Sequence, residues 1–290
     1  MLALQLLING LTLGAAYALV ALGFVLVLNA TGAVNFAQGD MVMAGGYVAI
    51  VLAGLLPVPG IVLLPLVLLA MAGLGLAFSA LAYFPLKTRP PEAVFISTIA
   101  LGIILQNGAN LLFGAAPRAA PPRRGAGTVA LGGLVVTTQS LAILATAAVL
   151  VLGQSLLLAR TRFGRMLRAI AEDRRMAEIL GVRVNIMIAA SFALGAALAG
   201  AAGLLLANQF FVTPAAGTDF IIKAYIAVTI GGWGSLAGAV SGALLIALFE
   251  VGMSALISDT AASAALYAAL LAILFLRPQG LFGEGARRHA

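Results

Sequence analysis

Long uncharged and mostly apolar stretches dominate this chain of 290 residues. A helix needs about 20 mostly apolar residues to cross the hydrocarbon core of a bilayer, and most of these stretches reach that length. They do not alternate apolar and polar positions as the strands of a membrane barrel do, so helices are the expected spanning elements. The pattern predicts spans near residues 6–28, 38–56, 61–84, 93–113, 139–159, 185–208, 219–234, 236–257 and 261–276.

The expected fold class is therefore an all-α polytopic membrane protein. It has nine transmembrane helices, or eight if one glycine-broken segment is re-entrant. Residues 1–290 are expected to form one transmembrane domain. The first apolar stretch lacks an early positive charge and a small-residue cleavage site, so it is expected to be a membrane segment rather than a signal peptide.

Two places favour a break in a helix. The run Gly231–Ser235 holds three glycines in four residues, and glycine is a poor helix former. A second candidate break covers Asn29–Gly32 and Val34–Asp40. Irregular backbone at membrane depth is tolerated only where it is buried in protein or lines a water-filled path. The two breaks are candidates for corresponding parts of two structural repeats, although no residue-level repeat supports this.

Composition narrows the class of protein further. Hydrophobic residues make up 63% of the chain and charged residues only 9%, against about 25% in soluble domains, so a cytosolic globular enzyme is excluded. The chain has no cysteine, and its one histidine is His289. Disulfide scaffolds, thiolate zinc sites and Ser-His catalysis in the membrane core are excluded too. Neither Lys87 nor Lys223 follows the glycine-rich run of a P-loop, so ATP chemistry is expected from another chain.

Lysine and arginine indicate the orientation, because cytoplasmic loops carry an excess of both. Seven arginines lie in 160–183, and the loop 85–92 and the tail 277–290 are also basic. With nine spans these three regions fall on one side, the cytoplasmic one. The N-terminus is then outside and the C-terminus inside. The outer loop 114–138 disagrees, since it holds Arg118, Arg123 and Arg124.

The segment 160–183 is the only long polar stretch, and its pattern is helical. An apolar stripe is expected from Met166, Ala169, Ile170, Ala177 and Leu180. A turn is expected near Glu172 and Asp173, and Gly181 is a natural helix end. Periodicity leaves two interpretations open: a basic helix resting on anionic lipid, or a docking surface for a cytoplasmic partner.

This segment resembles the conserved cytoplasmic loop of the branched-chain amino acid ABC transporter permeases. The matching positions are Thr161, Phe163, Gly164, Arg165, Arg168, Ala169, Ala171, Asp173, Ala177, Leu180, Gly181 and Val182. Further segments resemble that family in the same order, namely Asn9–Leu19, Val34–Tyr47, Gly231–Gly238 and Arg277–Gly283. The chain is most similar to the LivH-type membrane subunit. It departs from the commonest pattern at Gln38, where many members carry histidine.

The resemblance implies an inner-membrane subunit of a bacterial ATP-driven importer for leucine, isoleucine and valine. A periplasmic binding protein would deliver the substrate, a paralogous permease would complete the path in a heterodimer, and two cytoplasmic ATPases would bind inside. Similar permeases serve urea, amides or other amino acids, and a stand-alone secondary transporter is a further alternative. The chain itself would need no cofactor, because ATP-Mg binds to the partner ATPases. Lipid is an expected partner, and nucleic acid is not.

The same resemblance makes 160–183 the coupling helix. Its expected ATPase contacts are Phe163, Gly164, Arg165, Arg168, Ala169, Glu172 and Asp173.

Polar groups within the spans are candidates for a translocation path or gate. Asp40 is expected either to cap the next helix or to face the path. Asp219 and Lys223 are spaced i,i+4 and are expected to form a local ion pair. The candidate path or gate residues are Asn9, Asn35, Gln38, Asp40, Gln106, Asn107, Gly231, Gly232, Gly234, Ser235 and Glu250.

Overall fold

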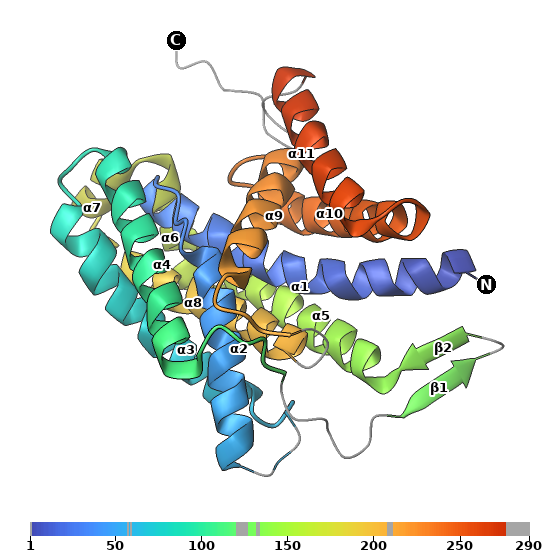
Figure 1. Cartoon of the computed structure of the whole chain (residues 1–290). Coiled ribbons are helices and arrows are strands. Elements are labelled where there is room, and N and C mark those ends of the chain that lie inside the picture. The colour runs from blue at the N-terminus through green and yellow to red at the C-terminus, as the bar shows by residue number, and fades with distance from the viewer. Residues whose placement is uncertain are drawn as a thin grey trace.

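A computed structural model describes residues 2–56, 58, 60–119, 127–131, 134–207 and 211–276 (Figure 1). Eight helices of this part are long and apolar enough to cross a membrane. They confirm the all-α polytopic class. The long helices are α1 (Leu2–Thr31), α2 (Gln38–Leu55), α3 (Leu64–Phe78), α4 (Pro91–Phe113), α5 (Thr138–Arg160), α8 (Val184–Ala207), α10 (Leu236–Leu256) and α11 (Asp259–Leu276).

Shorter elements complete the chain. A π-helical turn, η1 (Ser79–Tyr83), and a 3₁₀ turn, η2 (Phe84–Leu86), extend α3. The polar segment 160–183 forms α6 (Arg162–Glu172) and α7 (Arg174–Ile179). Helix α9 (Ala216–Gly231) precedes α10. The expected loop 114–138 contains an antiparallel hairpin that sequence analysis did not predict. Its strands are β1 (Thr128–Leu131) and β2 (Leu134–Thr137).

The predicted spans agree with the helices to within a few residues, with two informative differences. α1 continues to Thr31, whereas the expected span ended at residue 28. α9 ends at Gly231 and has only 16 residues, so it is shorter than a standard span. The tail 277–290, with its Arg277–Gly283 motif, lies outside the described residues.

Helices α1 and α8 form the centre of the molecule. α8 is buried over most of its length, and the core residues of α1 between Ala16 and Leu26 are almost inaccessible. Both helices are apolar around their whole circumference, which is typical of helices that other helices or lipid enclose completely. Figure 1 shows the N-terminus of α1 near the hairpin, and α6 and α7 at the opposite end of the molecule. The segment 160–183 and the hairpin therefore lie at opposite ends.

Glycine lets the central helices approach each other closely. A Cβ atom on Gly45 of α2 would collide with the backbone of Gly200 in α8. Gly10 and Gly14 of α1 pack directly on Leu248 and Leu244 of α10. The GxxxG pairs thus serve helix packing, as small residues do in lipid.

Both predicted helix breaks are present, but the first is shorter than expected: α1 continues to Thr31 and α2 begins at Gln38, so only residues 32–37 leave the helix. Gly32 follows α1 with φ of 68°, and Gly232 and Gly234 follow α9 with φ of 105° and 79°. These left-handed conformations favour glycine, which lacks a Cβ atom. The side chain of Asn29 donates from Nδ2 to the carbonyl oxygen of Gly234, 3.1 Å away, so the two breaks are joined. Their origin in a structural repeat stays a prediction.

Gly45→Ala tests the close packing. The added methyl group has no space against Gly200, so we expect a loss of about 1–3 kcal/mol of stability, measured as a lower thermal unfolding temperature in detergent. Gly73→Ala in α3 is the matched control, because nothing lies within 4 Å of its added Cβ atom. Equal unfolding temperatures for the two variants would contradict the packing argument.

Candidate functional site

The segment between α1 and α2 is largely shielded from solvent after the exposed Gly32, and side chains satisfy part of its backbone. The hydroxyl of Thr98 accepts from Phe36 N at 3.2 Å, and Asn35 Oδ1 accepts from Ala37 N at 3.2 Å. Gln38 donates from Nε2 to the carbonyl oxygen of Gly195 at 2.9 Å. Because Gly195 lies in the middle of α8, α2 begins at the middle of the helix bundle rather than at its end.

Asp40 lies in the first turn of α2 and is only 6% exposed. Its Oδ1 accepts a hydrogen bond from Gln106 Nε2 of α4 at 2.8 Å. Gly102 and Gly217 both leave room for the carboxylate, since a Cβ atom on either would collide with it. The alternative in which Asp40 caps α2 is wrong, because the N-cap residue is Ala37 and no side chain bonds at that cap. Asn35 also donates from Nδ2 to Gln38 Oε1 at 3.4 Å. These two hydrogen-bonded pairs, Asn35 with Gln38 and Asp40 with the partly buried Gln106, are called the buried polar cluster.

Asn107, the neighbour of Gln106, does not belong to this cluster. Its side chain is exposed and donates to the carbonyl oxygen of Ile103 in its own helix, at 2.8 Å.

A second polar cluster lies between α1, α9 and α10. Lys223 forms an ion pair with Glu250, with 2.5 Å between Nζ and Oε1. Tyr17 donates its hydroxyl hydrogen to Glu250 Oε2 at 3.1 Å and accepts from Lys223 Nζ at 2.9 Å. The expected ion pair between Asp219 and Lys223 is wrong, because the lysine reaches across to α10 instead of along its own helix.

This second cluster lines a cavity of about 770 Å³. Asn9 and Asp219 also line it, together with apolar side chains such as Leu13 and Phe220. Of the predicted path residues, Asn9 and Glu250 therefore belong to this cavity, and not to the buried cluster around Asp40.

The break between α9 and α10 holds the remaining predicted path residues. Ser235 caps α10, since its Oγ accepts from Gly238 N at 3.0 Å. Gly231 packs against Gly238 so closely that a Cβ atom on either would strike the other's backbone. The backbone therefore turns sharply through Gly231, Gly232, Gly234 and Ser235. Asn29 of α1 donates a hydrogen bond to this corner at Gly234.

The polar segment folds as two short helices, as expected. Thr161 caps α6 and Asp173 caps α7, so the predicted turn falls at Asp173. Gly164 is required where α6 meets α5, because a Cβ atom would collide with the carbonyl oxygen of Leu158. Arg168 donates from Nη1 to the same oxygen at 2.7 Å, which fixes α6 to the end of α5.

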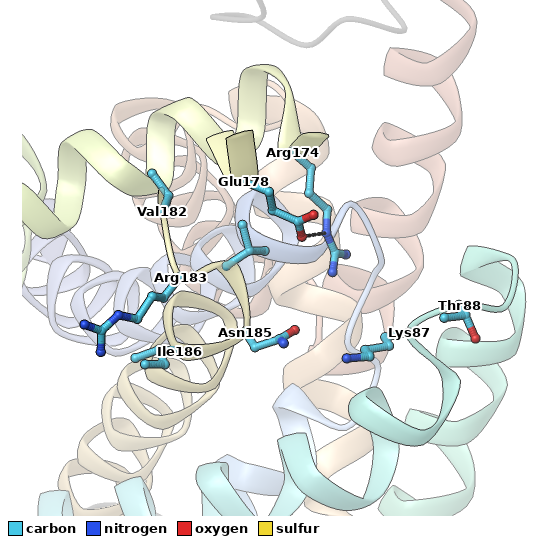
Figure 2. A pocket seen from close by; sticks show the side chains of 9 residues that line it. Lys87, Thr88, Arg174, Glu178, Val182, Arg183, Asn185 and Ile186 are labelled. Carbon is cyan, nitrogen blue, oxygen red and sulfur yellow. Dashed lines mark ion pairs between the residues drawn. The ribbon is translucent and has the colours of Figure 1, made fainter. Parts of the chain in front are cut away.

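A recess of about 640 Å³ lies beside α7 (Figure 2). Three cations line it, namely Lys87, Arg174 and Arg183, together with Glu178. Arg174 forms a 3.6 Å ion pair with Glu178, drawn as the dashed line, and donates to the Tyr83 hydroxyl at 2.7 Å. The second bond ties α7 to η1.

The predicted apolar stripe of this segment is only partly right. Ile170 and Ala177 are buried, together with Leu167. Leu180, by contrast, is 77% exposed, and Met166 is exposed too. Met176 and Ile179 join them, so α6 and α7 present apolar side chains to solvent beside the exposed Arg165, Glu172 and Asp173. An exposed apolar patch among charges is typical of a surface that binds another protein.

A small cavity connects this segment with the helix break. It measures about 150 Å³ and is lined by Gly164, Arg168 and Ala171 from α6 and by Asn29 and Gly234 from the two breaks. The segment 160–183 and the break at Gly231–Ser235, which are distant in sequence, therefore meet around one space.

Sequence reasoning missed four of these partners: Tyr17, Thr98, Tyr83 and the carbonyl oxygen of Leu158. Tyrosine or threonine in an apolar helix gives no signal of a partner in another helix, and a backbone acceptor has no signature in the sequence. The charges of Lys223 and Glu250 within predicted spans were the available indications of the second cluster.

Comparisons with known proteins agree with one another. A family model described as branched-chain amino acid transport system / permease component matches residues 6–276. The chain is 34% identical to the high-affinity branched-chain amino acid transport system permease protein BraD of Pseudomonas aeruginosa, over 97% of this chain and 96% of BraD. It is 33% identical to the corresponding LivH protein of Escherichia coli K12, over 97% of this chain and 96% of LivH. A probable LivH of Methanocaldococcus jannaschii is 31% identical over 80% of this chain and 75% of its own length.

Gln106→Leu and Asn107→Leu form a matched pair that tests the buried cluster. Loss of Gln106 removes the hydrogen bond to the Asp40 carboxylate, so we expect a loss of about 1–3 kcal/mol of stability. Loss of the exposed Asn107 should change stability by less than about 0.5 kcal/mol. Thermal unfolding of the purified variants measures both. A larger effect at Asn107 than at Gln106 would contradict the cluster.

Proposed function

Because the chain belongs to the family of branched-chain amino acid transport permease components, we propose that it is a membrane subunit of an ATP-driven importer of leucine, isoleucine and valine. The observation that carries this proposal is the match to BraD and LivH, which covers nearly the whole of both chains. Those relatives are named as permeases for branched-chain amino acids, and the chain is accordingly assigned a transport role rather than an enzymatic one.

The assembly follows from the resemblance in the loop 160–183. Two cytoplasmic ATPases, a paralogous permease and a periplasmic binding protein complete the transporter. The surface formed by α6 and α7 is the ATPase docking surface, with Phe163, Gly164 and Ala169 shaping it and Arg165, Glu172 and Asp173 exposed on it. Arg168 holds α6 in place through Leu158. The exposed Met176, Ile179 and Leu180 form an apolar patch that a partner can cover. The acidic side chains beside them, Glu172, Asp173 and Glu178, support a protein partner over anionic lipid, because anionic headgroups repel carboxylates.

This assignment gives the chain its orientation. The end that carries α6 and α7 faces the cytoplasm of the bacterial inner membrane, and so does the C-terminal end of α11. The hairpin and the cavity of about 770 Å³ then belong to the outer half, where a binding protein releases the substrate. The break at Gly231–Ser235 lies next to α6, and therefore between this outer cavity and the proposed ATPase docking surface.

Affinity purification of the tagged chain from native membranes, followed by mass spectrometry, tests this function. We expect two ATPases and a second permease to co-purify. A chain that purifies alone and moves leucine into liposomes without ATP would make the secondary transporter the correct interpretation.

Arg165→Glu tests the docking surface. Arg165 is exposed, and its side chain forms no hydrogen bond or ion pair within the described residues, so reversing its charge leaves the fold intact while opposing a matched partner surface. We expect at least a tenfold loss of ATPase co-purification, with normal amounts of permease in the membrane. Arg118→Glu is the control, because it makes the same charge change at a residue that contacts Phe113 and Val212 rather than α6 or α7. ATPase recovery equal to wild type in Arg165→Glu would contradict the assignment.

A further inference from the structure

The cluster of Tyr17, Lys223 and Glu250 brings together groups from three helices, α1, α9 and α10. Charged side chains inside membrane-spanning segments are costly, and they are retained mainly where they serve function. A buried ion pair also contributes little to stability, because the loss of hydration offsets the attraction between the charges. The cluster therefore requires an explanation other than stability.

The surroundings of the ion pair supply that explanation. The side chains of Lys223 and Glu250 are 19% and 16% exposed, so each presents an edge to the cavity rather than being sealed in the core. The cavity volume of about 770 Å³ falls within the range of about 300–1,000 Å³ that is typical of small-molecule sites. Apolar side chains form much of the wall, among them Leu6, Leu13, Leu206 and Phe220.

The charges of the cavity fit one class of solute. The lysine and the glutamate form a neutral pair, so a ligand with a single charge would leave one of them without a partner. A ligand that carries a carboxylate and an ammonium group on one carbon provides a partner for each. Asp219 and Asp259, which are exposed on the same cavity, add further negative groups that favour an ammonium and oppose anions.

We propose that this cavity is a transit site for a zwitterionic α-amino acid, with Lys223 binding its carboxylate and Glu250 its ammonium group. The inference rests on the proposed function and names the part of the chain that recognises the solute. Tyr17 holds the two charged side chains in position, since its hydroxyl bonds to both. The apolar wall accommodates an aliphatic side chain.

The exchange of partners explains how the site releases its ligand. Without solute, Lys223 and Glu250 neutralise each other, and with solute each is neutralised by one end of the zwitterion. Neither state leaves Lys223 or Glu250 with an unpaired charge at membrane depth, which would be costly. A transit site must bind weakly enough to release its solute, as in channels.

The double variant Lys223→Met and Glu250→Leu tests the site. Removing both charges together avoids an unpaired charge, and apolar replacements of buried ion pairs are often tolerated. The variant is reconstituted in liposomes with its partner permease, ATPases and binding protein. Two rates are measured: leucine uptake, and ATP hydrolysis stimulated by the leucine-loaded binding protein.

We expect at least a tenfold loss of leucine uptake, with ATP hydrolysis stimulated within about twofold of wild type. Ser241→Ala on the same helix is the control and should leave both rates unchanged, because Ser241 bonds only to its own helix. Leucine uptake by the double variant at the wild-type rate would overturn the transit site and leave the importer function intact. Failure of the wild-type assembly to take up leucine would instead overturn the proposed function.

A second measurement does not depend on the variant. The wild-type permease and ATPase assembly, without binding protein, is unfolded thermally in millimolar leucine, 4-methylpentanoate or isoamylamine. The last two lack the ammonium and the carboxylate, respectively. Leucine alone should raise the unfolding temperature, because a ligand that binds only the folded state stabilises it. Equal shifts with all three compounds, or no shift with leucine, would contradict the assignment.

Discussion

A backbone that leaves its helix inside a membrane must find hydrogen-bond partners within the protein, because the bilayer offers none. This constraint organises the molecule. Asn35 and Thr98 satisfy the segment after α1, and Asn29 and Ser235 satisfy the corner between α9 and α10. Three of the buried polar side chains, Asn35, Gln38 and Asp40, lie at the first break. Glycine then brings the helices close enough for short polar side chains to reach across, as between α2 and α8.

The same constraint connects the two ends of the transporter. Asn29 belongs to α1, bonds to Gly234 at the second break, and lines the small cavity beside α6. Packed interiors switch between discrete arrangements rather than deforming smoothly. A displacement of α6 by an ATPase would therefore reach the corner at Gly231–Ser235 directly. From that corner α9 and α10 extend to Lys223 and Glu250.

Sequence predicted the features that depend on local patterns. Long apolar windows located all eight helices of the described residues that are long enough to span, although they also predicted a ninth span where α9 is too short. The glycine-rich run Gly231–Ser235 located the second break. The sequence did not predict contacts that depend on which helices pack against each other. The i,i+4 spacing favoured Asp219 as the partner of Lys223, yet the fold supplies Glu250, 27 residues away. Helical periodicity grouped Met166 and Leu180 with Ile170, but it cannot tell a face buried against α5 from one exposed to solvent. Tyr17 gave no signal, because a tyrosine in an apolar helix is common.

The central claim is that this chain provides a path for branched-chain amino acids that only ATP hydrolysis opens. Its most direct test is the ATP dependence of leucine accumulation in liposomes that contain the complete assembly. The account predicts accumulation against a gradient with ATP and binding protein together, and no leucine movement when either is omitted. Equilibration of leucine across the liposome membrane without ATP would contradict it.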